Sequence, residues 1–448
     1  MTLADARGEA TSSSNPKSIE AFETALGQLH CYRGDPVETI DAALAEDPDF
    51  VMGHVLRAEV HTSLWERSVL PEIEASLSRL TELDNKANER ERAHIAAIRD
   101  WAAGNWEGFK GRLDRLLAEH PRDALALQIG HLSDFYHGDR DNLRNRVTRA
   151  LPAWTRETPG YGFVQGMLAF GQEECGDYAR AEESGRHAIE LEPDDCWAQH
   201  AIAHVMEMQA RQAEAIAFME SRTDHWAQDD NAFCFHNWWH TALYNLDQGN
   251  AGRALALYDT KIRPNGSEIQ LEMLDATALL WRMHLRGLDV GNRWEELAAT
   301  YDRIAEDGFY AFNDMHAMMS YVATGRSESA QRLLSAVEQA AEADNTNGGM
   351  TRAVGLPIVR AVEAFGREAY EETVDLLMPV RYRAHAFGGS HAQRDIVHRT
   401  VIEAALRGGQ YALAHALTNE RTAQKPHCPF SWQLSNRAKA GLKNGSVH

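Results

Sequence analysis

The stretch YGFVQGMLAFGQEECGDYARAEESGRHAIELEPDD, residues 161–195, decides the fold. Its apolar and small residues recur at spacings of three and four, which is the period of a helix that buries one face. Pro193 follows the second run, where a proline ends a helix because it has no backbone N–H to donate. The stretch therefore predicts two paired helices.

The pattern repeats along the chain. Small residues at matching positions allow close helix packing in three successive units, 162–195, 196–229 and 235–268, the third after a short insertion. A helix-turn-helix unit of about 34 residues is the tetratricopeptide signature. The small packing residues of the three units are Ala169, Ala181, Ala188, Ala203, Ala215, Ala242 and Ala254.

Helical periodicity extends well beyond these three units. It recurs from about residue 18 to residue 440, and alternating β-branched runs are few, so the predicted class is all-α. Roughly nine to eleven helix pairs would stack into one right-handed α-solenoid over 18–440, although 268–310 fits the register poorly. We expect this superhelix to curl into a nearly closed ring around a pocket. Residues 1–17 are predicted to be a disordered arm and 441–448 a flexible tail.

Composition narrows the class of protein. The chain has 448 residues and a formal net charge of −21, so nucleic acid, which is also negatively charged, is not an expected partner. No apolar run is long enough to span a membrane, and the first residues do not resemble a secretory signal. The five cysteines form no CxxC pair, which is typical of reduced thiols in a cytoplasmic protein.

Two neighbouring repeats carry a polar stripe. In HAIAHVMEMQ, residues 200–209, the side chains of His200, His204 and Glu207 share one helix face, and His236 and His240 are four apart in the next repeat. In tetratricopeptide register these positions face the concave side. We therefore predict that all five side chains line the central pocket, as catalytic groups.

Three interpretations of the stripe stay open. Imidazoles four apart on a helix can hold one divalent transition metal ion such as zinc, so His200, His204, His236 and His240 are candidate metal ligands. The same groups could act as acids and bases without a metal, because histidine titrates near neutral pH. They could also belong to a structural or interaction surface.

Other polar and aromatic residues are candidates for binding a substrate. Trp238 occupies a repeat packing position and is predicted to be core, whereas Trp239 either walls the pocket or fills the gap to the next repeat. In FNDMHAMMSY, residues 312–321, Asn313 is a candidate helix cap, and Asp314 and His316 could add a carboxylate and an imidazole to the pocket.

A candidate anion site follows near the end of the chain. In GGSHAQRDIV, residues 388–397, two glycines and a serine lead into a helix whose first turn carries Gln393, Arg394 and Asp395. A helix N-terminus beside an arginine can bind a carboxylate or phosphate through exposed N–H groups. We predict Arg394 to be the anion clamp.

These motifs, together with FHNWWHTALY, VGLPI and RYR in the same order, resemble the tetratricopeptide repeat protein 38 family over roughly residues 20–420. The resemblance implies a repeat fold and a set of recurring polar positions, but no established reaction. His391 departs from the family, in which an amide residue is expected. The implied positions are His200, His204, Glu207, His236, Asn237, His240, Asn313, Asp314, His316, Gln393, Arg394 and Asp395.

The leading functional hypothesis is a pocket that binds a small, anionic metabolite, with hydrolysis or lyase chemistry at the histidines. No nucleotide cofactor is expected, because the sequence has no phosphate-binding glycine fingerprint. The alternative is a non-catalytic scaffold that binds a partner protein or peptide on its concave face, and a homo-oligomer is compatible with either.

Overall fold

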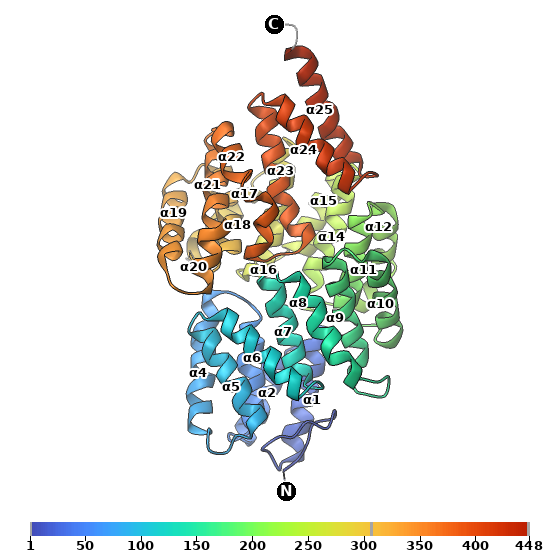
Figure 1. The fold of residues 1–448 in the computed structure, drawn as a ribbon, viewed down its shortest axis with the longest axis vertical. Helices are drawn as coiled ribbons and strands as arrows, with labels where there is room; N and C mark the ends of the chain where they lie inside the picture. Colours follow the sequence, from blue (N-terminus) through green and yellow to red (C-terminus); the bar gives the residue numbers. More distant parts are fainter. Residues whose placement is uncertain (1, 305–307, 446–448) are drawn as a thin grey trace. The chain divides into compact units, whose positions relative to one another are not determined.

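The computed structural model describes residues 2–304 and 308–445, and its regular structure is helical (Figure 1). Within these ranges, β-pairing is limited to two isolated bridges, Ala4 with Ala10 and Arg33 with Asn231. The all-α prediction is confirmed. The α-helices are α1 (Pro16–Cys31), α2 (Pro36–Glu46), α3 (Val51–Thr62), α4 (Leu70–Glu82), α5 (Glu89–Ala102), α6 (Trp106–Glu119), α7 (Ala124–Tyr136), α8 (Arg140–Ala150), α9 (Tyr161–Glu174), α10 (Tyr178–Leu191), α11 (Cys196–Met208), α12 (Gln212–Glu220), α13 (Thr223–Trp226), α14 (Cys234–Asp247), α15 (Ala251–Leu257), α16 (Gln270–Leu285), α17 (Arg293–Ile304), α18 (Ala311–Thr324), α19 (Ser327–Glu342), α20 (Thr346–Met350), α21 (Leu356–Gly366), α22 (Tyr370–Leu377), α23 (His391–Arg407), α24 (Tyr411–Gln424) and α25 (Pro429–Gly445).

The chain divides into two compact units. The first comprises Met1–Ile202 and Thr223–Cys234, and the second comprises Ala203–Arg222 and Phe235–His448. The division passes through α11, so His200 belongs to the first unit and His204 to the second.

Helix pairs follow the predicted repeats. Units 162–195, 196–229 and 235–268 correspond to α9 with α10, α11 with α12, and α14 with α15, and α10 ends two residues before Pro193. A Cβ atom at Gly171 would lie only 2.6 Å from the Cα atom of Arg144, so glycine lets α9 pack directly on the backbone of α8. Each predicted packing alanine is 0% exposed, as close helix packing requires: Ala169, Ala181, Ala188, Ala203, Ala215, Ala242 and Ala254.

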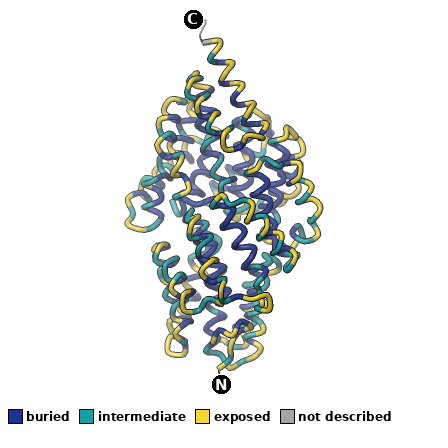
Figure 2. Tube along the Cα trace, turned by 45° about the vertical axis from the view of Figure 1, so that its right-hand side comes forward, coloured by how far each residue is buried: buried dark blue, intermediate teal, exposed yellow. Residues whose placement is uncertain are grey.

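The two helices of a pair differ in burial. In α14 every residue from Phe235 to Leu246 is buried, whereas in α10 the buried residues are confined to one face. Figure 2 shows the same contrast as dark blue inner helices and outer helices in which buried and exposed residues alternate. Residues 270–304, where the repeat register is poor, still form the helices α16 and α17.

Helices from distant parts of the sequence meet inside the second unit. Helix α16 contacts both α18 and α23. The Trp281 indole N–H donates to Thr400 Oγ1 at 3.0 Å, and Arg399 pairs with Asp247 at 3.1 Å, so α23 also reaches the end of α14. The interior of this unit is therefore built from α14, α16, α18 and α23. Closure of the superhelix into a ring stays a prediction.

The N-terminal segment is folded, in contrast to the predicted disordered arm. The Leu3 N–H donates to Ser13 O at 2.8 Å, and Thr11 N–H donates to Leu3 O at 2.9 Å, which makes residues 2–15 a hook. Buried Arg90 donates to Ala10 O at 3.1 Å and lies 3.6 Å from Asp5. Polar anchors therefore order a segment that has few apolar residues. At the other end, α25 includes 441–445 of the predicted tail, and 446–448 lie outside the described residues.

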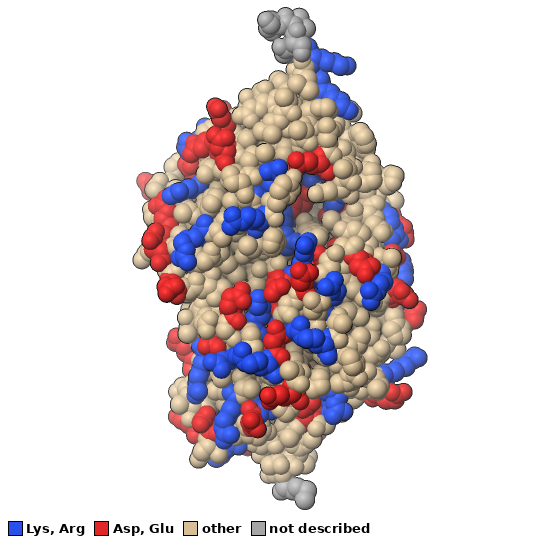
Figure 3. Space-filling view, in the orientation of Figure 1, with Lys and Arg blue, Asp and Glu red and all other residues tan. Residues whose placement is uncertain are grey.

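Charges of both signs are distributed over the face shown in Figure 3 and do not form one large field there. This distribution accords with acidic residues spread along the sequence. Among the described residues, none of the helices combines the length and the apolar character that crossing a membrane requires.

Candidate functional site

Two helices of the second unit bring three histidines together. His204 lies near the end of α11, and His236 and His240 lie one turn apart on α14. All three side chains are buried. One nitrogen of each ring lies within 4.8 Å of a nitrogen of the other two. The i, i+4 spacing of His236 and His240 on α14 therefore places their two imidazoles on the same helix face.

The His236 and His240 rings point toward each other through their Nε2 atoms, which are 3.2 Å apart. Their opposite nitrogens each contact a carboxylate: His236 Nδ1 donates to Asp275 Oδ2 at 2.6 Å, and His240 Nδ1 donates to Glu207 Oε2 at 3.2 Å. In the tautomer that donates Nδ1–H to the carboxylate, a neutral ring carries its lone pair on Nε2, so the two Nε2 lone pairs would converge. A shared proton or a bound cation between the two nitrogens would relieve the repulsion of such lone pairs.

Carboxylates behind metal-binding histidines are the usual way in which proteins orient the rings and fix their tautomer. Here Asp275 and Glu207 occupy that position. His204 approaches from the side, with its ring centroid 4.4 Å from that of His240. The donor set of imidazole nitrogens suits zinc and neighbouring transition metals.

Positive charge accumulates around these rings. Burial lowers the pKa of His240 well below its usual range, and the neighbouring His204 and His236 lower it further. Lys425 Nζ lies 3.7 Å from Glu207 Oε1, so the carboxylate behind His240 contacts one histidine and one ammonium group. At neutral pH the His240 ring is therefore a neutral base, the form that ligates metals.

His200, the first histidine of the predicted stripe, belongs to the first unit. It is buried, and its ring lies 5.1 Å from the rings of Phe170 and Trp197 and 5.2 Å from that of Phe233, centroid to centroid. It precedes His204 by one turn of the same helix. Its membership of the ligand set stays a prediction.

Arg282 and Trp239 form a second polar group beside the histidines. The guanidinium carbon of Arg282 lies 5.3 Å from the centroid of the Trp239 ring, which stacks on His236 at 5.3 Å. Arg282 Nε and Trp239 Nε1 are both buried and have no hydrogen-bond partner. His316 Nδ1 donates to Phe312 O at 2.8 Å, while its Nε2 is likewise buried and has no partner.

The remaining predicted residues on α14 and α18 have other surroundings. Asn237 is fully buried on α14. Trp238 is buried as predicted, and Lys261 Nζ lies 5.5 Å from its ring centroid. Helix α18 begins at Ala311, so Asn313 is inside the helix and the cap interpretation is wrong. Asp314 accepts a hydrogen bond from the Gly308 N–H at 2.8 Å.

At the start of α23 the predicted anion-binding groups contact protein atoms. Gln393 forms a capping box with Ser390, and Arg394 donates to Gly389 O. Asp395 Oδ2 accepts hydrogen bonds from Arg399 Nε at 2.6 Å and from Arg421 Nη2 at 3.0 Å. These residues stabilise the helix start and its ion pairs. His391 is the first residue of α23.

Three residues of the site were not predicted from the sequence: Asp275, Arg282 and Lys425. Asp275 and Arg282 are seven residues apart on α16, which places both on one helix face. That spacing was the available signal. The spacing of Asp275 and Arg282 was not recognised, because residues 268–310 match the repeat register poorly. Lys425 follows α24 and belongs to no local motif.

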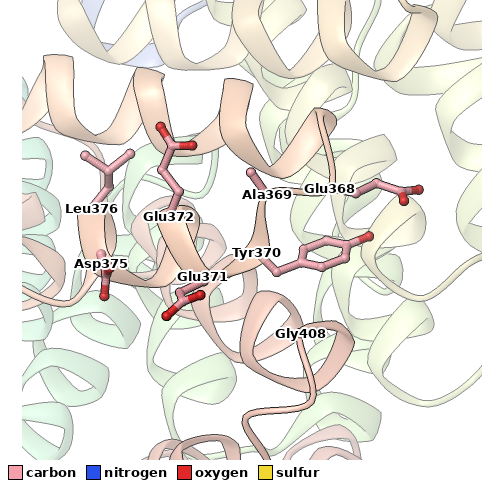
Figure 4. Close-up of a pocket in the computed structure, with 8 residues that line it drawn as sticks. All are labelled: Glu368, Ala369, Tyr370, Glu371, Glu372, Asp375, Leu376 and Gly408. Atoms are coloured by element: carbon pink, nitrogen blue, oxygen red, sulfur yellow. The ribbon is translucent and has the colours of Figure 1, made fainter.

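A surface pocket in the second unit is unrelated to these residues (Figure 4). It has a volume of about 730 Å³ and is lined by four carboxylates together with Ala369, Tyr370, Leu376 and Gly408. One of the carboxylates, Glu372, pairs with Arg367 at 3.2 Å. None of the predicted site residues lines this pocket.

No family model matches the chain. A chain in the crystal structure of the APC/C hetero-tetramer Cut9–Hcn1 is 14% identical, with 94% of this chain and 76% of that chain covered and a TM-score of 0.44. A chain of the human IFIT1 dimer with m7Gppp-AAAA is 11% identical. The match covers 94% of this chain and 99% of that chain, with a TM-score of 0.41. Yeast Tom70 is 14% identical. The match covers 96% of this chain and 89% of that chain, with a TM-score of 0.37.

These likenesses concern the fold and not the chemistry. By its own helices, the chain is an all-α protein with paired helices at the predicted repeats. Its membership of the tetratricopeptide repeat protein 38 family stays a prediction.

Proposed function

We propose that the second unit binds a divalent transition metal ion of the zinc class through His204, His236 and His240. The convergence of the His236 and His240 Nε2 atoms at 3.2 Å carries this proposal. Ligand nitrogens about 2.0–2.1 Å from a tetrahedral zinc ion are separated by a similar distance. Asp275 and Glu207 then orient the two rings from behind.

The chemistry that such a centre supports is hydrolysis. Three nitrogen ligands are typical of catalytic zinc sites, which keep a fourth position for water or substrate, whereas structural sites use four protein ligands. A bound ion of this class supplies a Lewis acid and lowers the pKa of bound water. In this assignment Glu207 holds the His240 tautomer instead of acting on substrate directly, which revises its predicted catalytic role.

Elemental analysis tests the proposal directly. Protein purified without chelators or an affinity metal should contain about one equivalent of a transition metal per chain, measured by plasma mass spectrometry. After chelation and dialysis, zinc titrated into the protein should bind at the same stoichiometry. A wild-type protein that holds no transition metal and takes up none in the titration would overturn the proposal.

Variants locate the ion. The double variant His236→Ala, His240→Ala should lose the metal while keeping its helical circular dichroism. His284→Ala is the matched control, because His284 lies in the same unit and stacks on Trp281 with centroids 5.1 Å apart, outside the ligand set. Metal retained at full stoichiometry by the double variant would contradict the assignment.

A non-catalytic scaffold that binds a partner protein is the second candidate. Helical-repeat folds bind partners through exposed helix faces, and the second unit exposes two large aromatic residues, Tyr382 at 57% and Trp432 at 46%. In this role the histidine variants would leave the protein's binding properties unchanged, and the metal analysis would find no ion. The same measurements therefore separate the two candidates.

A further inference from the structure

Arg282 is a buried cation that lacks a counter-ion in contact. Its side chain is 1% exposed, and among the described residues no carboxylate lies within salt-bridge distance of it. Its terminal nitrogens donate to two main-chain carbonyls, Ala278 O at 2.9 Å and Ala392 O at 2.6 Å. These bonds fix the guanidinium in place without neutralising it.

This arrangement differs from that of the other buried arginines nearby. Arg399 contacts Asp247 and Asp395, and Arg421 contacts Asp395. Burial and the charge of Arg399 lower the pKa of Arg282 to about 10, against the opposing charges of Asp395, Glu207 and Asp247. A buried charge without a counter-ion in contact costs free energy that distant carboxylates offset only in part. An anion bound in contact with Arg282 would reduce this cost.

A second donor lies beside this guanidinium. Trp239 Nε1 is an N–H donor with no acceptor, in the ring over which the Arg282 guanidinium lies. A buried donor without an acceptor is uncommon, because it forfeits the hydrogen bond that it makes with water in the unfolded chain. Arg282 Nε and Trp239 Nε1 thus offer two N–H groups from adjacent helices, α16 and α14.

His316 on α18 belongs to the same buried region. Burial lowers the pKa of His316 to about 4, and the charge of Arg282 contributes to this shift. The ring is therefore neutral at pH 7, with Nδ1–H bonded to Phe312 O and the Nε2 lone pair without a donor. Three helices direct polar atoms that lack partners toward this part of the interior.

We propose that Arg282 and Trp239 form an anion subsite that binds the carboxylate group of a small substrate. The two N–H groups match the two oxygens of a carboxylate. A phosphate group has more acceptor oxygens and a charge near −1.5 to −2, and so needs more donors than this pair supplies. The occupant is therefore a small monocarboxylate.

The rest of the ligand extends toward the histidines. Trp239 lies between the two groups: it stacks on His236 at 5.3 Å and packs edge to face on His240 at 4.9 Å. A molecule held by its carboxylate at Arg282 thus has its next few atoms beside the histidine nitrogens. This placement rests on the proposed metal centre, whereas carboxylate binding itself does not. The substrate class is a small carboxylic acid with a hydrolysable bond.

The Trp239 indole N–H provides a direct probe. In protein labelled with ¹⁵N-tryptophan, the Trp239→Phe variant identifies the Trp239 resonance among those of the 11 tryptophans. Acetate and propionate are titrated against the wild type, with phosphate at equal ionic strength for comparison. We expect the Trp239 resonance to shift saturably with the carboxylates and not with phosphate.

Two arginine variants distinguish this subsite from the start of α23. Arg282→Lys keeps the charge but loses the Nε donor, and it should weaken the apparent carboxylate affinity by roughly 10-fold or more, as expected for a hydrogen bond to a charged group. Arg394→Gln removes the arginine that the sequence favours and should leave the affinity unchanged. An unchanged affinity in Arg282→Lys, no shift in the wild type, or an equal response to phosphate would each overturn the subsite.

The same samples separate this inference from the metal proposal. The titration is run before and after removal of metal by chelation, with the metal content of each sample measured. A shift of the Trp239 resonance in protein that never binds metal supports the carboxylate subsite and refutes the metal centre. Stoichiometric metal without any such shift refutes the subsite alone.

Discussion

The two units each contain a buried histidine network, and the two networks differ in what the second ring nitrogen contacts. In the first unit, His94 Nδ1 lies 2.8 Å from Glu59 Oε1 and its Nε2 lies 2.9 Å from Asp123 Oδ2. In the second unit, His236 and His240 each contact a carboxylate through Nδ1, and their Nε2 atoms face each other. We call the contacts of His94 the closed network, because both ring nitrogens face carboxylates. We call those of His236 and His240 the converging network, because their Nε2 atoms face each other.

The contact of that second nitrogen decides what each network can do. Burial alone would lower the pKa of His94, but the charges of Glu59 and Asp123 outweigh it and raise the pKa to about 10. His94 is therefore an imidazolium that donates through both nitrogens and cannot ligate a metal. Arg90, 2.6 Å from Asp123, completes a charge network that also holds the N-terminal hook. This network is structural.

Breaking the closed network should have the largest effect on stability. His94→Ala leaves two carboxylates, Glu59 and Asp123, in a fully buried site, and removing one partner of a buried ion pair costs about 3–5 kcal/mol. We expect a loss of this size in urea unfolding followed by circular dichroism, with no change in metal content. The control is His187→Ala, since the side chain of His187 is 43% exposed. A loss below about 1 kcal/mol, as for surface pairs, would contradict the structural role.

The pH dependence of stability sharpens the same contrast. Since folding raises the pKa of His94 from 6.5 to about 10, its contribution is fully present below pH 6.5 and is lost as the pH rises toward 10. The unfolding midpoint of the wild type should therefore fall between these limits relative to that of His94→Gln. Parallel pH profiles for the two proteins would show that His94 is not charged in the folded state.

The sequence predicts those parts of the site that depend on local spacing. His236 and His240 are one helical turn apart, and the repeat register places His204 on the preceding first helix, so their approach follows from helix geometry and repeat stacking. Asp275 could not be paired with His236 in this way, because the two lie 39 residues apart and the register is poor around Asp275.

The anion site shows why local signals also mislead. Serine and glycine before α23 indicate a helix N-terminus, and that much is confirmed. The same signal cannot say whether the exposed N–H groups bind a ligand or a side chain. Gln393 and Ser390 satisfy them through a capping box. Arg282, which takes over the anion-binding role in our proposal, is distinguished only by the tertiary structure, which leaves it without a carboxylate partner.

Weakening the converging network should affect metal affinity more than stability. Asp275→Asn keeps the size of the side chain but removes the charge behind His236, and changes of this kind typically lower metal affinity by about 10–100-fold. Competition with a chromophoric chelator measures the change. Asp123→Asn, in the closed network, is the counterpart that should leave the metal affinity unchanged. Equal losses in both variants would mean that the two networks do not differ in function.

The smallest effect is expected for Glu207→Gln. Glu207 accepts from His240 Nδ1 at 3.2 Å, a longer contact than the 2.6 Å between Asp275 and His236, and its other oxygen lies near Lys425. A glutamine oxygen can still accept the Nδ1 proton, so the ring keeps its tautomer. We expect a loss of metal affinity of about 10-fold or less, at the low end of the range for such groups. A larger loss than in Asp275→Asn would mean that Glu207 binds the metal directly.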